Sequence, residues 1–178
     1  MWPIPRTTTR SSDGPDPGAG RRRARFRRSG WWCSECGTHA VFAAATGACT
    51  VAETQLADSL LPQLQPGMLL LADRGFPDYD RWKAAAATGA DLLWRVASNV
   101  VLLVREQYTD GSYLSEIYAA RDKRRVNGQL VRVIEYTVAG HEEDGPIRLI
   151  TTILDPDQAP AAELAALCYE RWEVEKVH

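Results

Sequence analysis

One carboxylate in this 178-residue chain stands where ligand chemistry is common. Asp73 follows the apolar run 68–72 and precedes Arg74, so the pattern predicts a buried strand that ends at charged side chains. In open α/β sheets, ligands bind at the carboxyl ends of the strands. Asp73 is therefore a candidate ligand-binding residue. The alternative is that its carboxylate only caps the turn or helix that follows.

A second polar group lies in residues 160–177, where apolar spacing among good helix formers predicts a helix. Arg171 and Glu175 are four residues apart and Cys168 stands three residues before Arg171, so the three share one helix face. An Arg–Glu pair at this spacing is commonly a solvated salt bridge. Considered with Asp73, however, Glu175 is a second carboxylate for a shared site.

The segments LLLADRGF (69–76) and YERWEVE (169–175) resemble two motifs of DDE transposases of the insertion sequence 4 family. In that family a hydrophobic strand leads to the second aspartate and an Arg-Gly-aromatic turn, and a later helix carries Tyr, Arg and Glu at fixed spacing. Arg171 and Glu175 match the family in type and spacing. The resemblance covers residues 35–178.

This resemblance implies an α/β fold of the ribonuclease-H-like type, a mixed sheet with flanking helices that is incomplete here. A β-rich insert over about residues 97–158 would interrupt it. The resemblance also implies a site in which three carboxylates hold two Mg²⁺ or Mn²⁺ ions, because hard cations about 3.5–4 Å apart need oxygen ligands. Asp73 and Glu175 would be the catalytic pair and the metal ligands.

DNA, as transposon ends, is the partner that the resemblance implies, and the parent activity is metal-dependent DNA cleavage and strand transfer. Arg171 would contact phosphate near the active site, with Arg74 and Tyr169 as further DNA contacts. Tyr169 is one place away from the family's tyrosine position, which Cys168 occupies here. A homodimer is a candidate state of the intact parent.

The family's first aspartate has no counterpart on a strand. Asp13 and Asp16 lie in a Pro- and Gly-rich stretch that is incompatible with a central strand. Residues 1–34 are predicted to be a disordered arm, because they contain too few apolar residues to offset chain entropy, and the abrupt change after them fits a frameshift or fusion junction. Residues 35–178 are then a partial catalytic domain. We expect a truncated transposase that is inactive by itself.

Charge divides the chain in the same place. Residues 1–32 hold eight arginines and two aspartates, whereas the remainder holds 13 basic and 21 acidic residues. A non-enzymatic DNA-binding remnant that uses this basic arm is the competing function, because arginines neutralise phosphates and release counterions. The basic segment 121–125 is predicted to be a solvated turn, with DNA contact as its alternative.

A small zinc-binding module is a third hypothesis. Cys33, Cys36, His39 and Cys49 lie at short spacings that suit tetrahedral Zn²⁺, although a second well-spaced pair is absent. The sequence has no apolar run approaching the roughly 18 residues of a membrane span and no segment typical of a secretory signal. We therefore expect a cytoplasmic protein without membrane association.

Hydrophobic spacing also predicts the elements that position these residues. Apolar residues predict a strand over 38–47 and a strand over 91–96. Residues 128–138 and 146–154 alternate with a period of two, which is typical of strands in hairpins. Two helices are expected between the strands: one that buries Leu56, Leu60, Leu61 and Leu64 after a capping box at Thr50 and Glu53, and one that begins at Pro77 and Asp78 and ends at Gly89.

Overall fold

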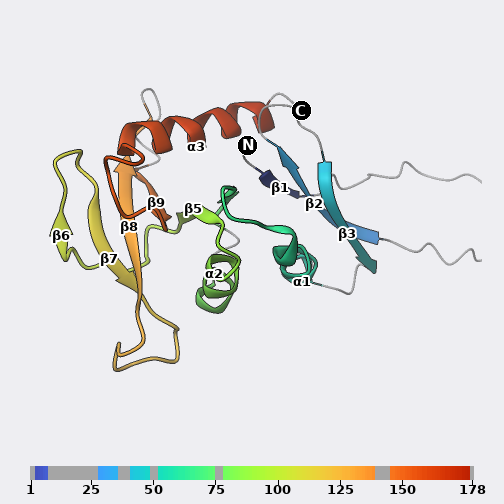
Figure 1. Ribbon diagram of the computed structural model, residues 1–178, viewed down its shortest axis with the longest axis horizontal. Helices are drawn as coiled ribbons and strands as arrows, with labels where there is room; N and C mark the ends of the chain where they lie inside the picture. The colour runs from blue at the N-terminus through green and yellow to red at the C-terminus, as the bar shows by residue number, and fades with distance from the viewer. Residues whose placement is uncertain are drawn as a thin grey trace, which may run out of the picture.

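A six-stranded mixed sheet forms the centre of the protein (Figure 1). The computed structural model describes residues 3–7, 28–35, 41–48, 52–74, 78–138 and 145–176. The strands run in the order β4-β5-β9-β8-β7-β6, in which β4 and β5 are parallel and every other neighbouring pair is antiparallel. Their bounds are β4 Leu69–Ala72, β5 Asp91–Val96, β6 Glu106–Gln107, β7 Tyr113–Ile117, β8 Gln129–Tyr136 and β9 Ile147–Thr151. The predicted α/β class is confirmed.

Helices cover both faces of this sheet. On one face lie α1 (Glu53–Asp58), a 3₁₀ turn η1 (Leu61–Gln63) and α2 (Tyr79–Ala86), whereas α3 (Ala161–Lys176) crosses the other face (Figure 1). All four residues of β4 are buried, with Leu70 and Ala72 in the first core and Leu69 and Leu71 in the second. The wholly apolar run before Asp73 therefore exists because both faces of the strand are covered.

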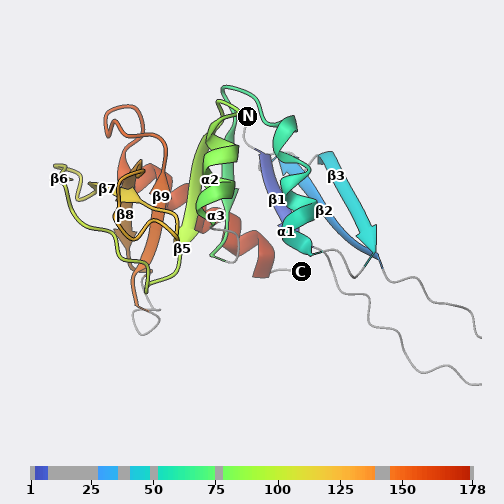
Figure 2. The same cartoon turned by 90° about the horizontal axis from the view of Figure 1, so that it is seen from below.

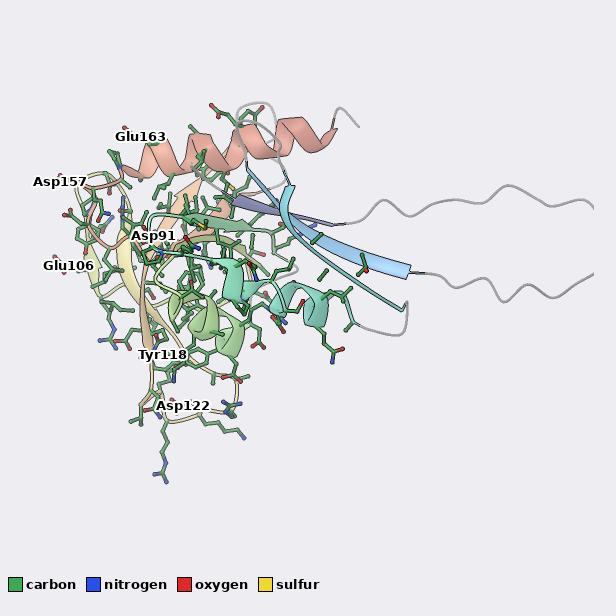
Figure 3. The ribbon with its side chains drawn as sticks, turned by 45° about the vertical axis from the view of Figure 1, so that its right-hand side comes forward. Asp91, Glu106, Tyr118, Asp122, Asp157 and Glu163 are labelled. Atoms are coloured by element: carbon green, nitrogen blue, oxygen red, sulfur yellow. The ribbon has the colours of Figure 1, made fainter. Side chains whose placement is uncertain are left out.

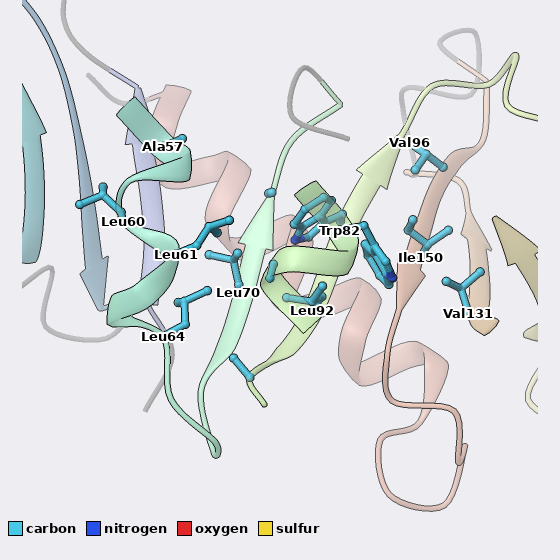
Figure 4. Close-up of a cluster of buried hydrophobic side chains, with 14 of the residues drawn as sticks. Ala57, Leu60, Leu61, Leu64, Leu70, Trp82, Leu92, Val96, Val131 and Ile150 are labelled. Atoms are coloured by element: carbon cyan, nitrogen blue, oxygen red, sulfur yellow. The ribbon is translucent and has the colours of Figure 1, made fainter. Parts of the chain in front are cut away.

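The core between α2 and the sheet is built around two tryptophans (Figure 4). Trp82 from α2 and Trp94 from β5 are 2% and 0% exposed, and their rings meet edge to face with centroids 5.0 Å apart. Aromatic pairs favour this arrangement because the positive ring edge faces the negative ring face. The contact fixes α2 on the β4-β5 pair.

The predicted signals at Asp78 and Gly89 are confirmed, and Pro77 lies outside the described residues. Asp78 is its N-cap and accepts hydrogen bonds from the N–H groups of Asp80 and Arg81 at 2.9 and 3.3 Å. Gly89, at φ 82°, ends the turn after the helix in a left-handed conformation that a side chain disfavours. The helix connects the parallel strands β4 and β5, as a βαβ unit requires.

The other predicted helix is shorter than its leucine spacing indicates. It ends as α1 at Asp58 and continues only as the turn η1, which contains Pro62 near its start. Proline lacks an N–H group and its ring clashes with the preceding turn, so a continuous helix to Leu64 cannot form. The four predicted leucines are nonetheless buried at Leu56, Leu60, Leu61 and Leu64. The predicted capping box of Thr50 and Glu53 is wrong, because α1 has Ala52 as its N-cap, without a side-chain cap, and Glu53 is its first residue; Thr50 lies outside the described residues.

Three further strands form a separate antiparallel sheet in the order β1-β2-β3, namely β1 (Pro3–Thr7), β2 (Arg28–Glu35) and β3 (Val41–Ala48). Strand β1 lies alongside β4, and α1 packs on β2 and β3 (Figure 2). The described parts of the predicted disordered arm are thus strands, because backbone pairing can order a segment that has little apolar surface. The rest of the arm lies outside the described residues, and a frameshift or fusion origin stays a prediction.

The predicted β-rich insert after β5 continues the six-stranded sheet. Strand β9 pairs with β5, so that Ile150 lies opposite Trp94, and β8 pairs with the other edge of β9. The hairpin strands predicted over 128–138 and 146–154 are confirmed as β8 and β9. Their apolar faces, including Val133 and Ile150, are needed to complete the core that α2 covers.

Candidate functional site

Asp73 lies at the carboxyl end of β4, where the strand leaves the sheet. The residue is half-buried, and its Oδ1 accepts a hydrogen bond of 2.5 Å from the N–H of Arg74. Within the described part of the chain, Oδ2 accepts no hydrogen bond. The N-cap of the next helix is Asp78 and not Asp73. The cap-like contact of the Asp73 carboxylate among the described residues is the hydrogen bond from the N–H of Arg74. Arg74 is exposed beside it.

Glu175 and Arg171 lie in the last turns of α3, as predicted. Their side chains lie outside the described part of the structure, so the predicted approach of the Asp73 and Glu175 carboxylates to within about 10 Å stays a prediction. The backbone places α3 over the face of the sheet that contains Leu69 and Leu71 of β4. From its start over β8 and β9 the helix runs toward β4 and β1 (Figures 1 and 2).

The buried stripe of α3 shows which face of the helix meets the sheet. Ala161, Leu164 and Cys168 are 8%, 5% and 5% exposed, at the three- and four-residue spacing of one helix face. Two turns beyond Cys168 the same face reaches position 175. Glu175 stands seven residues beyond Cys168 in α3, and a ligand set shared with Asp73 stays a prediction.

Cys168 and Tyr169 differ in environment. Cys168 packs in the core beside Tyr136 of β8, and burial, followed by the neighbouring thiol, raises the pKa of the Tyr136 phenol. Tyr169 is 39% exposed at a shallow surface recess that Thr137 and Val138 also line. The tyrosine that sequence reasoning placed near DNA is therefore accessible, and the cysteine that replaces the family's tyrosine is a core residue.

No group of three or more His, Cys, Asp or Glu side chains gathers into a metal site among the residues whose side chains are described. Of the predicted zinc ligands, Cys33 lies in β2, and Cys36, His39 and Cys49 lie outside the described residues. The zinc-module hypothesis stays a prediction. Likewise, no described helix is long and apolar enough to cross a bilayer.

Comparison with known protein families assigns the segment that contains this strand, aspartate and helix to one family. The model of the transposase DDE domain matches residues 32–178. The chain belongs to the DDE transposase family. Its six-stranded mixed sheet with few helices is consistent with a ribonuclease-H-like DDE domain, as predicted. No curated protein matches the sequence. The DDE domains of this family generally depend on divalent metal ions, and transposases act on DNA.

In this DDE domain, a buried arginine that sequence reasoning missed anchors the start of α3. Arg132 of β8 is fully buried and donates to the backbone oxygen of Ala159 at 2.7 Å, just before the helix. It also donates to Asp110 Oδ2 at 2.6 Å, and the same oxygen accepts the N–H of Ala161 at 3.0 Å. Glu175 lies about 21 Å along the helix from this anchor, so a tilt of about 10° there would move position 175 by about 4 Å.

The sequence feature that could have indicated this role is the charged Arg132 between apolar residues in the strand QLVRVIEY. A single strand cannot show whether such an arginine faces water or a partner. The contact of Asp110 with Arg132 spans 22 residues and depends on how the hairpin folds.

Asp110 makes the stability of the DDE domain depend on pH in the acid range. Burial alone raises the pKa of this carboxyl, but the hydroxyl and N–H of Ser112, the N–H of Ala161 and the charge of Arg132 outweigh it and lower the pKa from 3.8 to about 2. A carboxyl with a lowered folded-state pKa contributes stability above its unfolded value, which is lost as pH falls through the folded value. We expect the urea midpoint to fall between about pH 4 and pH 2.

The matched variant is Asp110→Asn, which keeps the side-chain shape and removes the titrating proton. Its urea midpoint should be lower at pH 7 and should change less between about pH 4 and pH 2 than that of the wild-type chain. If the urea midpoints of the two proteins changed equally between about pH 4 and pH 2, Asp110 would not cause this part of the acid sensitivity.

Proposed function

We propose that this chain is a truncated DDE transposase of the insertion sequence 4 type. Its intact parent carries out metal-dependent DNA cleavage and strand transfer at transposon ends. The observation that carries the proposal is the position of Asp73 at the carboxyl end of the buried strand β4, in a chain that matches the transposase DDE domain over residues 32–178. A helix on the adjoining sheet face carries Glu175.

The donor set fits Mg²⁺ or Mn²⁺. Asp73 supplies a half-buried carboxylate whose Oδ2 accepts no hydrogen bond from a described residue, and carboxylate oxygen is the ligand that these hard cations prefer. Glu175 would be the second carboxylate ligand. Ions held there would activate the attacking water or DNA 3′-hydroxyl and stabilise the leaving oxygen.

The chain's own residues would hold the DNA around that site. Arg171 lies one helical turn before Glu175 and would bind a phosphate next to the reacting one, since a guanidinium can donate two parallel hydrogen bonds to phosphate oxygens. Arg74 and Tyr169 are both exposed and would add contacts to the DNA backbone. The rigid β4 and the anchored start of α3 would fix the two carboxylates relative to each other.

The proposal includes loss of activity in this chain by itself. Strand β1, which lies alongside β4, consists of Pro3, Ile4, Pro5, Arg6 and Thr7 and so offers no carboxylate toward Asp73. The family's site uses three carboxylates, and two would leave at least one ion short of ligands. Non-enzymatic DNA binding through the N-terminal arginines is the competing proposal, supported by the eight arginines in residues 1–32.

Metal binding tests the assignment directly. We expect the full chain to bind Mn²⁺ saturably, measured by loss of the free-ion electron paramagnetic resonance signal. Asp73→Asn and Glu175→Gln should each weaken binding by at least about 10-fold, because even a residue behind a metal ligand costs about that much.

Two exposed carboxylates serve as matched controls. Glu163→Gln removes a charge from the first turn of the same helix, and Asp157→Asn removes one from the loop before it. Neither change should alter Mn²⁺ affinity by more than about 2-fold, since exposed single carboxylates bind such ions weakly. If Asp73→Asn and Glu175→Gln behaved like these controls, the proposed metal site would be wrong.

A further inference from the structure

A basic loop between β7 and β8, residues 119–128, carries three cations that have no acidic partner in the described structure. Lys123, Arg124 and Arg125 are all exposed. The other arginine of the loop, Arg121, is paired with Asp80 through two hydrogen bonds of 3.0 Å. The loop's only carboxylate, on Asp122, accepts the N–H groups of Val126 and Asn127. These three cations therefore form no ion pair among the described residues, and the Asp122 carboxylate leaves the loop with a net positive charge.

The loop has a defined conformation. Asp122 closes it through those two N–H groups at 3.0 and 2.9 Å. Arg125 adopts a positive φ of 53°, and its guanidinium lies over the ring of Tyr118 at 5.8 Å. A platform with fixed backbone loses less conformational entropy on binding than a flexible tail does.

Two contacts dock this loop on the first turn of α2. Tyr79 Oη donates to the backbone oxygen of Asn127 at 2.6 Å, and Arg121 binds Asp80. Because α2 begins just after the connection from Asp73, the loop lies toward the carboxyl edge of β4. Figure 3 shows Tyr118 and Asp122 at the end of the hairpin that is remote from Glu163 of α3.

The surface next to the loop is hollowed and includes Arg125. A recess of about 300 Å³ beside it is lined by Val101, Leu103, Arg105, Glu116, Tyr118 and Arg125. Arg105 is held by Glu116 at 2.6 Å, so Arg125 is the cation of this recess with no acidic partner among the described residues. The rest of the chain after residue 32 has more acidic than basic residues, so a loop with three cations unpaired among the described residues is an exception in this part of the chain.

We propose that Lys123, Arg124 and Arg125 bind the phosphate backbone of duplex DNA beside the site of Asp73. This inference rests on the proposed transposase function and adds a second DNA contact to it, in the loop that packs on the first turn of α2. The contact is to phosphates and therefore independent of base sequence. Each cation that binds one phosphate releases counterions, so each contributes about 0.9 to the salt dependence of binding.

The test measures binding of the full chain to a fluorescein-labelled duplex by anisotropy over a range of NaCl concentrations. The variant carries Lys123→Gln, Arg124→Gln and Arg125→Asn, and asparagine is used at 125 because it tolerates a positive φ. The slope of log affinity against log salt should fall in magnitude by about 2 to 3. An unchanged urea midpoint verifies that the variant is folded.

Arg121→Gln is the matched control, since it removes one positive charge from the same loop but takes it from an existing ion pair. Its slope should stay within about 0.3 of the wild-type slope. If the triple variant showed no larger change than Arg121→Gln, binding would belong to the N-terminal arm or to no DNA site in this loop, and the proposal would be overturned.

Failure of this inference can be told apart from failure of the proposed metal site. Asp73→Asn should leave the salt slope unchanged and weaken Mn²⁺ binding, whereas the triple variant should lower the slope and leave Mn²⁺ binding unchanged. If Asp73→Asn left Mn²⁺ binding unchanged while the triple variant still lowered the salt slope, only the proposed metal site would be contradicted. The reverse pattern would contradict the DNA contact alone.

Discussion

Arg132→Met lowers the free energy of unfolding by about 3 kcal/mol or more, because removal of one partner from a buried ion pair leaves the other uncompensated. Arg132 is fully buried, and its loss removes one donor each from Asp110, Ser112 Oγ and the carbonyl oxygen of Ala159, although Asp110 keeps its hydrogen bonds from Ser112 and Ala161. Each unsatisfied buried group adds a desolvation cost of about 1–3 kcal/mol. The loss is measured by urea denaturation at pH 7.

The exposed pair of Arg121 and Asp80 provides the comparison for this prediction. Its side chains are 77% and 59% exposed, and its guanidinium donates two hydrogen bonds to the carboxylate, whereas Arg132 donates one to Asp110. Arg121→Met should cost less than about 1 kcal/mol, because water solvates both charges when the pair is broken. Equal losses from Arg132→Met and Arg121→Met would show that the buried network does not stabilise the fold.

Anchoring by Arg132 also has a functional consequence in the proposed enzyme. The network joins β8, the turn at Asp110 and the start of α3, which are brought together only in the folded chain. A loosened start of α3 would let Glu175 move relative to Asp73. Arg132→Met should therefore weaken Mn²⁺ binding at temperatures where the variant is still fully folded, whereas Arg121→Met should not.

We expect the 178-residue chain by itself to give no DNA cleavage with Mg²⁺ or Mn²⁺ on duplexes that carry the ends of its element. The reason is that two of the family's three carboxylates cannot complete the ligand sets of two ions, so charge at the reacting phosphate is not neutralised. A protein that joins residues 35–178 to the upstream part of an intact relative should cleave the same duplexes. Gel electrophoresis of labelled DNA detects the product.

The restored protein then tests the residue assignment. Asp73→Ala and Glu175→Ala should each reduce its cleavage rate by at least about 100-fold, the cost of losing one electrostatic stabiliser from an active site. Asp157→Ala, an exposed loop carboxylate, should leave the rate unchanged. Cleavage by the unrestored chain that disappeared in Asp73→Ala would contradict the proposed loss of activity.

Individual elements and the candidate carboxylates were predictable from sequence, because their signals are local. The apolar run of β4 before Asp73, the cap at Asp78 with Gly89 beyond the helix, and the strand at 91–96 all matched the structure. Capping and hydrophobic spacing involve residues a few positions apart, so a single segment contains the necessary information. The break after α1 was readable in principle from Pro62.

Contacts between distant segments were decided only by the tertiary structure. Three contacts join distant residues: the pairing of β9 with β5, the bond from Arg132 to Asp110 and the docking of the basic loop on α2. Their separations run from 22 positions, for Arg132 and Asp110, to 58, for Leu93 and Thr151. A charged residue such as Arg132 or Arg121 has the same local pattern whether it meets water or a carboxylate. Burial depends on what the rest of the chain brings against it, and that distinguishes the fully buried Arg132 from the exposed Arg121.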